Sequence, residues 1–457
     1  MSSSHGPGAD GQALSRRRLL AALGTGATVS LAGCSAMNRR TTVSGSWQTR
    51  GYGPARTGAP ADVSGPKPPL KRRWKADFVG DWNQSSPVVA GDTVYLGSMT
   101  GGMSGREAET YLNAFDASTG EGRWTRSIEQ HTPKHNSSYA DSLTASDDGL
   151  FIQTFRGLRA LDFDGTERWK FENTGPRFLA DTCHPAITDG VVYTGTYGST
   201  RVRDDDDEYS GSEGLFALDA SDGSLLWEYR PDEYATDLTF SPTVADGTVY
   251  LCFLGRAIVA LDTADGEVQW TRAVPVDTPA TVRNGTAYVA TQVFHERDDT
   301  HEYRLYALDA ETGETVWDRP VGGAWSSRGI SHDGSALYLS SDRYLLSLDA
   351  ETGEVRWRAF GDASDWHSEI GWFDDDHAPI SGWGVPVVID DVVYAGDGEY
   401  GTLVALDSET GELLDAAPKR RWGASGTEGS PAVADGVAFY TTPHFLHAVD
   451  TNVFEFW

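Results

Sequence analysis

Short runs of β-branched and aromatic residues alternate with polar turn residues along most of the chain. At 241–250 (SPTVADGTVY) two apolar stretches flank an Asp-Gly pair, which is a strong signal for a β-hairpin. At 260–270 (ALDTADGEVQW) a strand ends at Leu-Asp, glycine takes a turn position that favours positive φ, and the next strand carries tryptophan. Together the two patterns predict four antiparallel strands.

The four-strand unit recurs along the chain. Its second half carries an aspartate in eight copies, 40 to 58 residues apart, at Asp116, Asp162, Asp219, Asp262, Asp309, Asp349, Asp407 and Asp450. A period of this size with variable insertions is typical of propeller or solenoid arrays. Because four antiparallel strands make one propeller blade, the pattern predicts an all-β, eight-bladed β-propeller of four-stranded antiparallel blades.

The recurring aspartate and tryptophan have a structural interpretation. We expect the aspartate to bond its own turn and the tryptophan to pack between neighbouring blades. Eight aspartates at equivalent positions cannot all be catalytic. The predicted docking tryptophans are Trp74, Trp124, Trp169, Trp227, Trp270, Trp317 and Trp357. In the seventh copy Asp415 stands where the tryptophan is expected, and Trp422 is a candidate replacement.

The motif A-x-D-x-x-T-G-x-x-x-W resembles the tryptophan-docking motif of pyrroloquinoline-quinone (PQQ) repeat β-propellers. The resemblance covers about residues 74–457. This family contains quinoprotein alcohol dehydrogenases, which are enzymes, and lipoproteins like the outer-membrane assembly factor BamB, which bind proteins and hold no quinone. The resemblance therefore implies the fold strongly and leaves two classes of function open.

Two segments could complete the last blade. The stretch KRRWKADF at 71–78 looks like a fourth strand separated from its blade, and VFEFW at 453–457 could fill the same position. Propellers often close through an N-terminal strand, so we expect closure by the strand that contains Trp74.

The N-terminus reads as a targeting segment. SRRRLL at 15–20, with Arg16 and Arg17, resembles a twin-arginine export signal, and LAGC at 31–34 resembles a lipobox with Cys34 as the lipidated residue. The alternative is a disordered basic tail with an incidental cysteine. We expect a lipoprotein signal peptide over 1–33, a flexible tether over 34–69, part of which docks on the propeller, and the propeller itself over 70–457.

The net charge of the chain limits the classes of partner that we expect. The formal net charge is −30, with 67 acidic against 37 basic residues. This excess argues against nucleic acid and against direct binding to an anionic membrane, so we expect membrane contact only through the lipid anchor. An acidic surface with few lysines is typical of halophiles, whose salt screens the repulsion, and it suggests a haloarchaeal source.

The longest insertions fall on one predicted face, at 97–111, 195–214, 291–303 and 361–384. Elaborated loops on one face of a repeat protein mark a candidate binding face. The candidate residues there are Trp82, His184, Trp325, Trp366, His367 and Trp383. Acidic runs at 204–208 and 374–376 could bind calcium, although solvated loops explain them as well, and we assign no metal ligands.

Two functions follow from the resemblance. Its quinone dehydrogenases carry adjacent cysteines over the quinone and a calcium site, whereas Cys183 and Cys252 are far apart in this chain. We therefore expect a lipid-anchored, exported scaffold on the extracellular side of the membrane, with no cofactor and no catalytic residues, that binds envelope or surface proteins or a small ligand. The alternative is a PQQ-dependent alcohol or aldose dehydrogenase that uses calcium.

Overall fold

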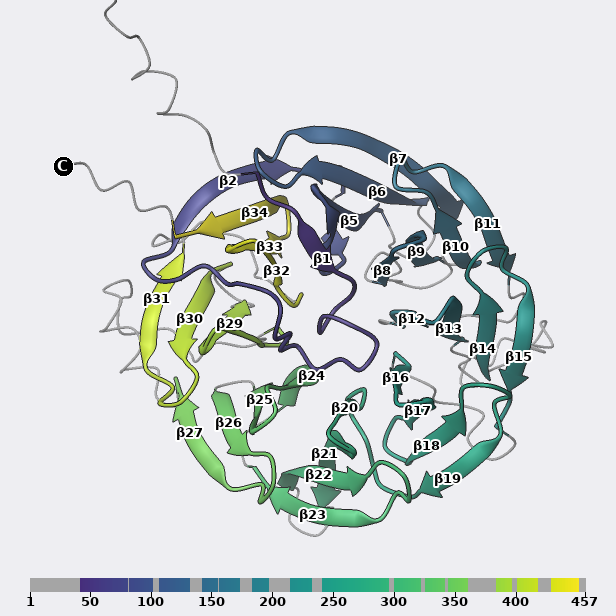
Figure 1. The fold of residues 1–457 in the computed structure, drawn as a ribbon, viewed down its shortest axis with the longest axis vertical. Helices are drawn as coiled ribbons and strands as arrows, with labels where there is room; N and C mark the ends of the chain where they lie inside the picture. Colours follow the sequence, from purple (N-terminus) through teal and green to yellow (C-terminus); the bar gives the residue numbers. More distant parts are fainter. Residues whose placement is uncertain are drawn as a thin grey trace, which may run out of the picture. The chain divides into compact units, whose positions relative to one another are not determined.

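The computed structural model describes residues 42–80, 82–101, 107–131, 142–154, 156–172, 183–196, 214–231, 241–295, 300–321, 325–341, 344–360, 384–396, 401–417 and 429–451. They belong to one compact unit, Thr42–Trp457, which is distinct from Met1–Thr41. Figure 1 shows eight antiparallel sheets in a ring around a common axis, which confirms the eight-bladed propeller. No helix within these residues is long and apolar enough to cross a membrane.

Each blade is one sheet, and its strands run outward from the axis in chain order, except that the outermost strand of the last blade comes from the N-terminal part of the propeller. Blade 1 contains β4 (Val88–Gly91), β5 (Thr93–Thr100), β6 (Ala108–Asp116) and β7 (Gly122–His131), and blade 2 contains β8 (Leu143–Ser146), β9 (Gly149–Thr154), β10 (Gly157–Leu161) and β11 (Glu167–Glu172). Blade 3 contains β12 (Ala186–Thr188), β13 (Val191–Thr196), β14 (Gly214–Asp219) and β15 (Leu225–Tyr229). Blade 4 contains β16 (Thr243–Ala245), β17 (Thr248–Phe253), β18 (Ala257–Asp262) and β19 (Val268–Arg272). Blade 1 also carries the short strands β1 (Gly45–Trp47) and β3 (Trp82–Gln84).

The other half of the ring repeats the arrangement. Blade 5 contains β20 (Thr281–Arg283), β21 (Thr286–His295), β22 (Thr300–Asp309) and β23 (Thr315–Pro320), and blade 6 contains β24 (Trp325–His332), β25 (Ala336–Ser341), β26 (Leu345–Asp349) and β27 (Val355–Ala359). Blade 7 contains β28 (Val387–Ile389), β29 (Val392–Gly396), β30 (Leu403–Asp407) and β31 (Leu413–Ala417). Blade 8 contains β32 (Ala432–Ala434), β33 (Val437–Thr442), β34 (Phe445–Asp450) and β2 (Lys71–Asp77).

Strand burial follows distance from the axis. All six residues of β17 are buried, because this strand faces a neighbouring sheet on both sides. In the outermost strand β19 only Trp270 is buried. The apolar clusters lie between adjacent sheets: one joins Tyr193 and Leu215 of blade 3 to Leu251 of blade 4. The core is therefore a series of interfaces between blades.

The aspartate turn joins the third and fourth strands in blades 1 to 7. In blade 4 the Asp262 carboxylate accepts the backbone N–H of Ala264 at 2.8 Å, and the N–H of Gly266 donates to the Asp262 carbonyl at 3.0 Å. Gly266 has φ of +75°, a conformation that costs glycine little. The recurring aspartates and glycines thus build the turns between third and fourth strands.

The strand that contains Trp74 closes the ring. β2 pairs antiparallel with β34, with Trp74 opposite Ala448. The expectation of closure by this segment is confirmed, while the competing segment at 453–457 lies outside the described residues. Residues near the two ends of the propeller thus share one sheet.

The segment 42–70, here called the hub strap, crosses the centre of the ring (Figure 1). β1 pairs with β4, and further strap carbonyls accept backbone N–H groups from the inner ends of other blades. These bonds are Ala145 to Gln48, Val244 to Pro54, Val282 to Ala55, His332 to Thr57, Val388 to Gly58 and Gly436 to Ser64, at 2.7 to 3.1 Å. Buried backbone donors need such acceptors. Residues 42–69 therefore differ from the flexible tether expected there: they form part of the propeller.

The strap also fills the junction between blades 7 and 8. Asp415, which stands opposite Ala405 where other blades have tryptophan, accepts the backbone N–H of Leu70 at 2.6 Å. The Tyr394 hydroxyl donates to the Pro66 carbonyl. Strap groups thus take the place of a docked indole, while Trp422, the replacement considered from the sequence, lies outside the described residues.

Candidate binding sites at the hub and between the blades

The hub contains a buried arginine. Arg56 of the strap is 5% exposed, and its guanidinium donates to the backbone carbonyls of Pro242 at 3.0 Å, His184 at 3.0 Å and Arg50 at 3.3 Å. Burial lowers the pKa of Arg56 to about 10, and the nearby Cys183 and Cys252 partly oppose this shift. Arg56 stays charged at neutral pH and ties the strap to blades 3 and 4.

His184, one of the candidate binding residues, lies in this buried region. It is 1% exposed, its backbone N–H donates to the Ser241 hydroxyl at 2.8 Å, and its ring Nδ1 lies 3.4 Å from the same oxygen. Its carbonyl holds Arg56. The structure therefore gives His184 a supporting position at the axis, between its own blade and the next.

Neither described cysteine is disposed to react. Both are free thiols. Burial raises the pKa of Cys183, and it raises the pKa of Cys252 to about 12. Since the thiolate is the nucleophile and the metal ligand, burial disfavours the reactive form of both side chains. Within the described ranges, no group of three His, Cys, Asp or Glu residues could hold a metal ion.

The other residues proposed for the loop-rich face are not brought together by the described structure. Trp82 lies in β3 and Trp325 in β24, but their side chains are outside what is described. Trp366, His367 and Trp383 fall within 361–383, and Arg16, Arg17 and Cys34 within 1–41; both ranges lie outside the described residues, as do both acidic runs.

Six of the seven predicted docking tryptophans make one recurring contact. The indole N–H of each donates to the carbonyl of the residue that follows the turn aspartate in the next blade. The pairs are Trp74 with Ala117, Trp169 with Ala220, Trp227 with Thr263, Trp270 with Ala310, Trp317 with Ala350 and Trp357 with Ser408, at 2.9 to 3.1 Å. Each bond joins one blade to its neighbour.

The junction between blades 1 and 2 departs from this pattern. In blade 1 the N–H of Gly120 bonds the carbonyl of Asp116, four residues back, whereas in blade 2 the N–H of Gly165 bonds that of Asp162, only three residues back. The blade 2 turn is one residue shorter, and no described residue accepts a hydrogen bond from the Trp124 indole. The sequence carried this signal, because tryptophan follows aspartate by seven residues at 162–169 but by eight at 116–124.

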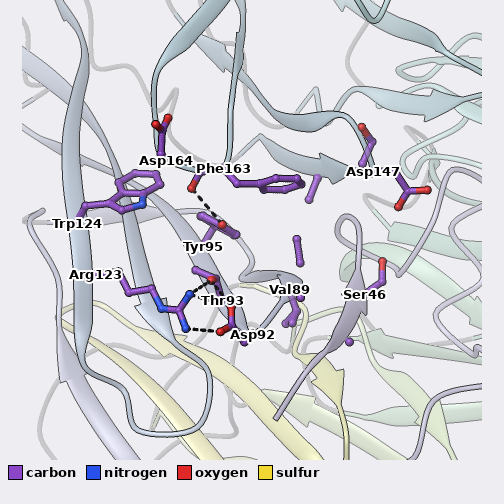
Figure 2. Close-up of a pocket in the computed structure, with 15 residues that line it drawn as sticks. Ser46, Val89, Asp92, Thr93, Tyr95, Arg123, Trp124, Asp147, Phe163 and Asp164 are labelled. Carbon is purple, nitrogen blue, oxygen red and sulfur yellow. Dashed lines mark hydrogen bonds and ion pairs between the residues drawn. The ribbon is translucent and has the colours of Figure 1, made fainter. Parts of the chain in front are cut away.

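A pocket of about 670 Å³ opens beside this junction (Figure 2). Tyr95, Trp124 and Phe163 form its aromatic wall, with the Tyr95 ring centre 5.8 Å from that of Trp124 and 6.0 Å from that of Phe163. The Tyr95 hydroxyl donates to the Phe163 carbonyl at 3.2 Å. Residues Gly45 and Ser46 of the strap line the side nearest the axis. Sequence reasoning missed this site because it lies away from the long loops.

The pocket rim is acidic. It carries the carboxylates of Asp92, Asp147 and Asp164 and a single guanidinium, that of Arg123. Arg123 bonds Asp92 at 2.7 Å and Asp116 at 2.8 Å, and its hydrogen bonds hold the pKa of Asp92 below its usual value. Hydrogen bonds from Thr166 lower the pKa of Asp164. At neutral pH the rim is therefore negatively charged around aromatic rings.

A family model described as outer membrane protein assembly factor BamB matches residues 155–324 and 272–442, which together span more than half of the chain. The chain belongs to this family. The BamB of Yersinia pestis is 25% identical over 239 residues, covering 49% of this chain and 57% of the relative, so the chain spans less than two thirds of that protein.

Enzymes also resemble this BamB-family chain. The tetrathionate hydrolase of Acidithiobacillus ferrooxidans is 21% identical over 436 residues, which cover 75% of this chain and 80% of the enzyme. The structure of quinohemoprotein alcohol dehydrogenase from Comamonas testosteroni has a TM-score of 0.61 at 15% identity and covers 90% of this chain and 80% of its own. At such identity the structural likeness shows the fold alone.

Two features expected around a quinone with calcium can be sought among the described residues. A calcium site needs several oxygen ligands, and these residues provide no cluster of carboxylates that could hold a metal. Cys183 and Cys252 lie on different blades and are not joined. The strap also occupies the turn-side end of the axis.

Proposed function

We propose that this protein is a lipid-anchored propeller that acts on the extracellular side of the membrane as a scaffold for envelope or surface proteins or a small ligand. The BamB-family match over 155–442 carries the proposal. The hub, which is filled by backbone and by Arg56, suits a rigid binding body. The acidic surface suits function in molar salt, as in a haloarchaeon.

The anchor would limit the distance of the scaffold from the bilayer. The strap enters beside turns of blades 1 and 8, where the N–H of Val43 donates to the Ser118 hydroxyl and that of Ser44 to the Asp435 carboxylate, both at 2.8 Å. Cys34 precedes Thr42 by eight residues, which span at most about 28 Å when extended. A lipid on Cys34 would keep the propeller within this reach of the bilayer.

The first experiment tests the address. Replacing Arg16 and Arg17 with lysine should block export, and Cys34→Ser should release folded protein into the medium, because the chain would lose its lipid. Fractionation of cells, membranes and medium in molar salt measures both effects. If the Cys34→Ser protein stays in the membrane fraction, lipid anchoring at this cysteine is refuted.

The second experiment separates the scaffold from the alternative, a PQQ-dependent alcohol or aldose dehydrogenase. PQQ with calcium should leave the melting temperature of the purified protein unchanged and support no dye-linked oxidation. A ligand at a hundred times its dissociation constant would add about 2.7 kcal/mol of stability, which a thermal melt resolves. A clear upward shift together with substrate-dependent dye reduction would establish the enzyme in place of the scaffold.

A further inference from the structure

The pocket between blades 1 and 2 combines three features that no other described junction has in the same form. A large aromatic side chain, Phe163, follows the turn aspartate of blade 2 and is 38% exposed. The corresponding residues in the other seven copies are small: Ala117, Ala220, Thr263, Ala310, Ala350, Ser408 and Thr451. An exposed aromatic at this one position enlarges the apolar wall of the pocket.

The second feature is a pair of carboxylates that form no ion pair among the described residues. Asp147 and Asp164 are exposed on the pocket rim, and neither forms an ion pair with any described residue. Asp92, the third acidic residue of the rim, is already bonded by both terminal nitrogens of Arg123. The pocket rim therefore carries more carboxylates than paired cations, and the charge of Arg126 acts on Asp164 without forming an ion pair with it.

The third feature is the Trp124 indole. In six other junctions the equivalent N–H bonds a backbone carbonyl of the next blade, whereas the shortened turn of blade 2 leaves this N–H without a described acceptor. A ligand with its own peptide carbonyl could supply one. The chain already places an arginine on this ring, because the Arg126 guanidinium lies 5.4 Å from the Trp124 ring centre.

We propose that this pocket binds an arginine side chain from an extended segment of a partner polypeptide. The guanidinium stacks on the exposed Phe163 ring and donates to Asp164, while a neighbouring peptide carbonyl of the partner accepts the Trp124 N–H. Arginine fits this combination since its planar cation stacks on aromatic faces and offers several donors. The proposal rests on the scaffold function and names the chemistry of the partner that it recognises.

The test measures binding of a fluorescein-labelled glycine–serine peptide with one central arginine, by fluorescence anisotropy in molar salt. A matched peptide carries citrulline, which keeps the shape but loses the charge. We expect the arginine peptide to bind at least tenfold more tightly. Molar salt suppresses general attraction to a chain of charge −30, so a preference that survives reflects a specific site.

Matched variants locate the site. Asp164→Asn should weaken binding about fivefold, whereas Asp222→Asn should leave it unchanged, because Asp222 occupies the equivalent turn position in blade 3 and makes the same 2.9 Å bond to a backbone N–H two residues on. Phe163→Ser removes the exposed ring and should weaken binding at least as much. Trp124→Phe keeps an aromatic face, although a smaller one, and removes the N–H. Melting temperatures show that each variant is folded.

Three results would overturn the proposal. Equal binding of the citrulline peptide would remove the role of charge, and equal losses in Asp164→Asn and Asp222→Asn would place the binding elsewhere. Tighter binding by a variant with Arg39 and Arg40 replaced by serine would mean that the pocket serves the chain's own N-terminal segment. The peptide assay does not depend on the lipid. A negative peptide result therefore does not affect the Cys34 test of the scaffold, and a negative Cys34 result does not affect the peptide assay.

Discussion

Replacing Trp317 with phenylalanine tests what the docked tryptophans contribute. Trp317 is 7% exposed and donates to the Ala350 carbonyl at 3.1 Å. The Tyr288 hydroxyl donates to the same carbonyl at 3.2 Å, so the Ala350 carbonyl would keep one hydrogen-bond donor in the variant. The lost hydrogen bond should therefore cost about 1 kcal/mol. The smaller ring should cost roughly a further 1 kcal/mol of packing over Gly353.

Trp124 provides the matched control. Its indole has no described acceptor, and its ring is partly exposed, so Trp124→Phe should cost about 1 kcal/mol less than Trp317→Phe. Trp317→Ala sets the upper end, since truncating a buried tryptophan costs about 3 to 5 kcal/mol.

Equilibrium urea unfolding at constant molar salt, followed by near-ultraviolet circular dichroism, measures all three variants. Thermal melts provide a second comparison, because a repeat protein of this length need not unfold in one step. If Trp124→Phe destabilises the protein as much as Trp317→Phe, the bond from indole to carbonyl is not what distinguishes the two junctions. The explanation offered for the pocket would then fail as well.

Two further predictions concern the turns and the hub. Gly353→Ala should destabilise the protein by about 2 kcal/mol, because φ is +70° and a Cβ would lie 2.7 Å from the docked indole. Gly285→Ala is the control: φ is +72° but the space around it is open, so it should cost only about 1 kcal/mol in the same unfolding assay. Equal losses in the two variants would contradict the packing argument. Burial, and then the charge of Arg283, lowers the pKa of His332 to about 4, with a smaller opposing effect from Asp333. Since the unfolded chain binds this proton below about pH 6.5, stability should be present above that pH and fall by roughly 3 kcal/mol as pH drops through 4. His332→Gln should remove that part of the pH dependence, and an unchanged slope in urea titrations would refute it.

The position of the pocket shows how far sequence reasoning reached at the candidate site. The seven-residue spacing at 162–169 was visible, but spacing alone does not say whether Trp124 keeps a partner. That depends on where the carbonyl of Phe163 lies relative to a ring on another blade, and the Tyr95 hydroxyl bonds that carbonyl. For His184 the sequence signal pointed to the wrong environment. Its position before a strand predicts a loop on the binding face, whereas the assembled ring of blades buries it.

Local signals determined the repeating part of the molecule. Alternating apolar residues, Asp-Gly turns and the regular return of Leu-Asp and tryptophan specify four short antiparallel strands, because these features act within a few residues of one another. Repetition then predicts the blades. Because the last blade lacks its fourth strand, repetition also predicts that the strand around Trp74 pairs with β34.

Only the tertiary structure decided the course of the hub strap. Its sequence is rich in glycine, proline and polar residues and has no periodicity, so the sequence alone predicts a tether. Its carbonyls find partners only when the inner strands of several blades converge on the axis and present N–H groups there. The same convergence buries Arg56 among three backbone carbonyls and lets Leu70 bond Asp415 where a tryptophan is missing. These contacts join residues hundreds of positions apart, which no local pattern encodes.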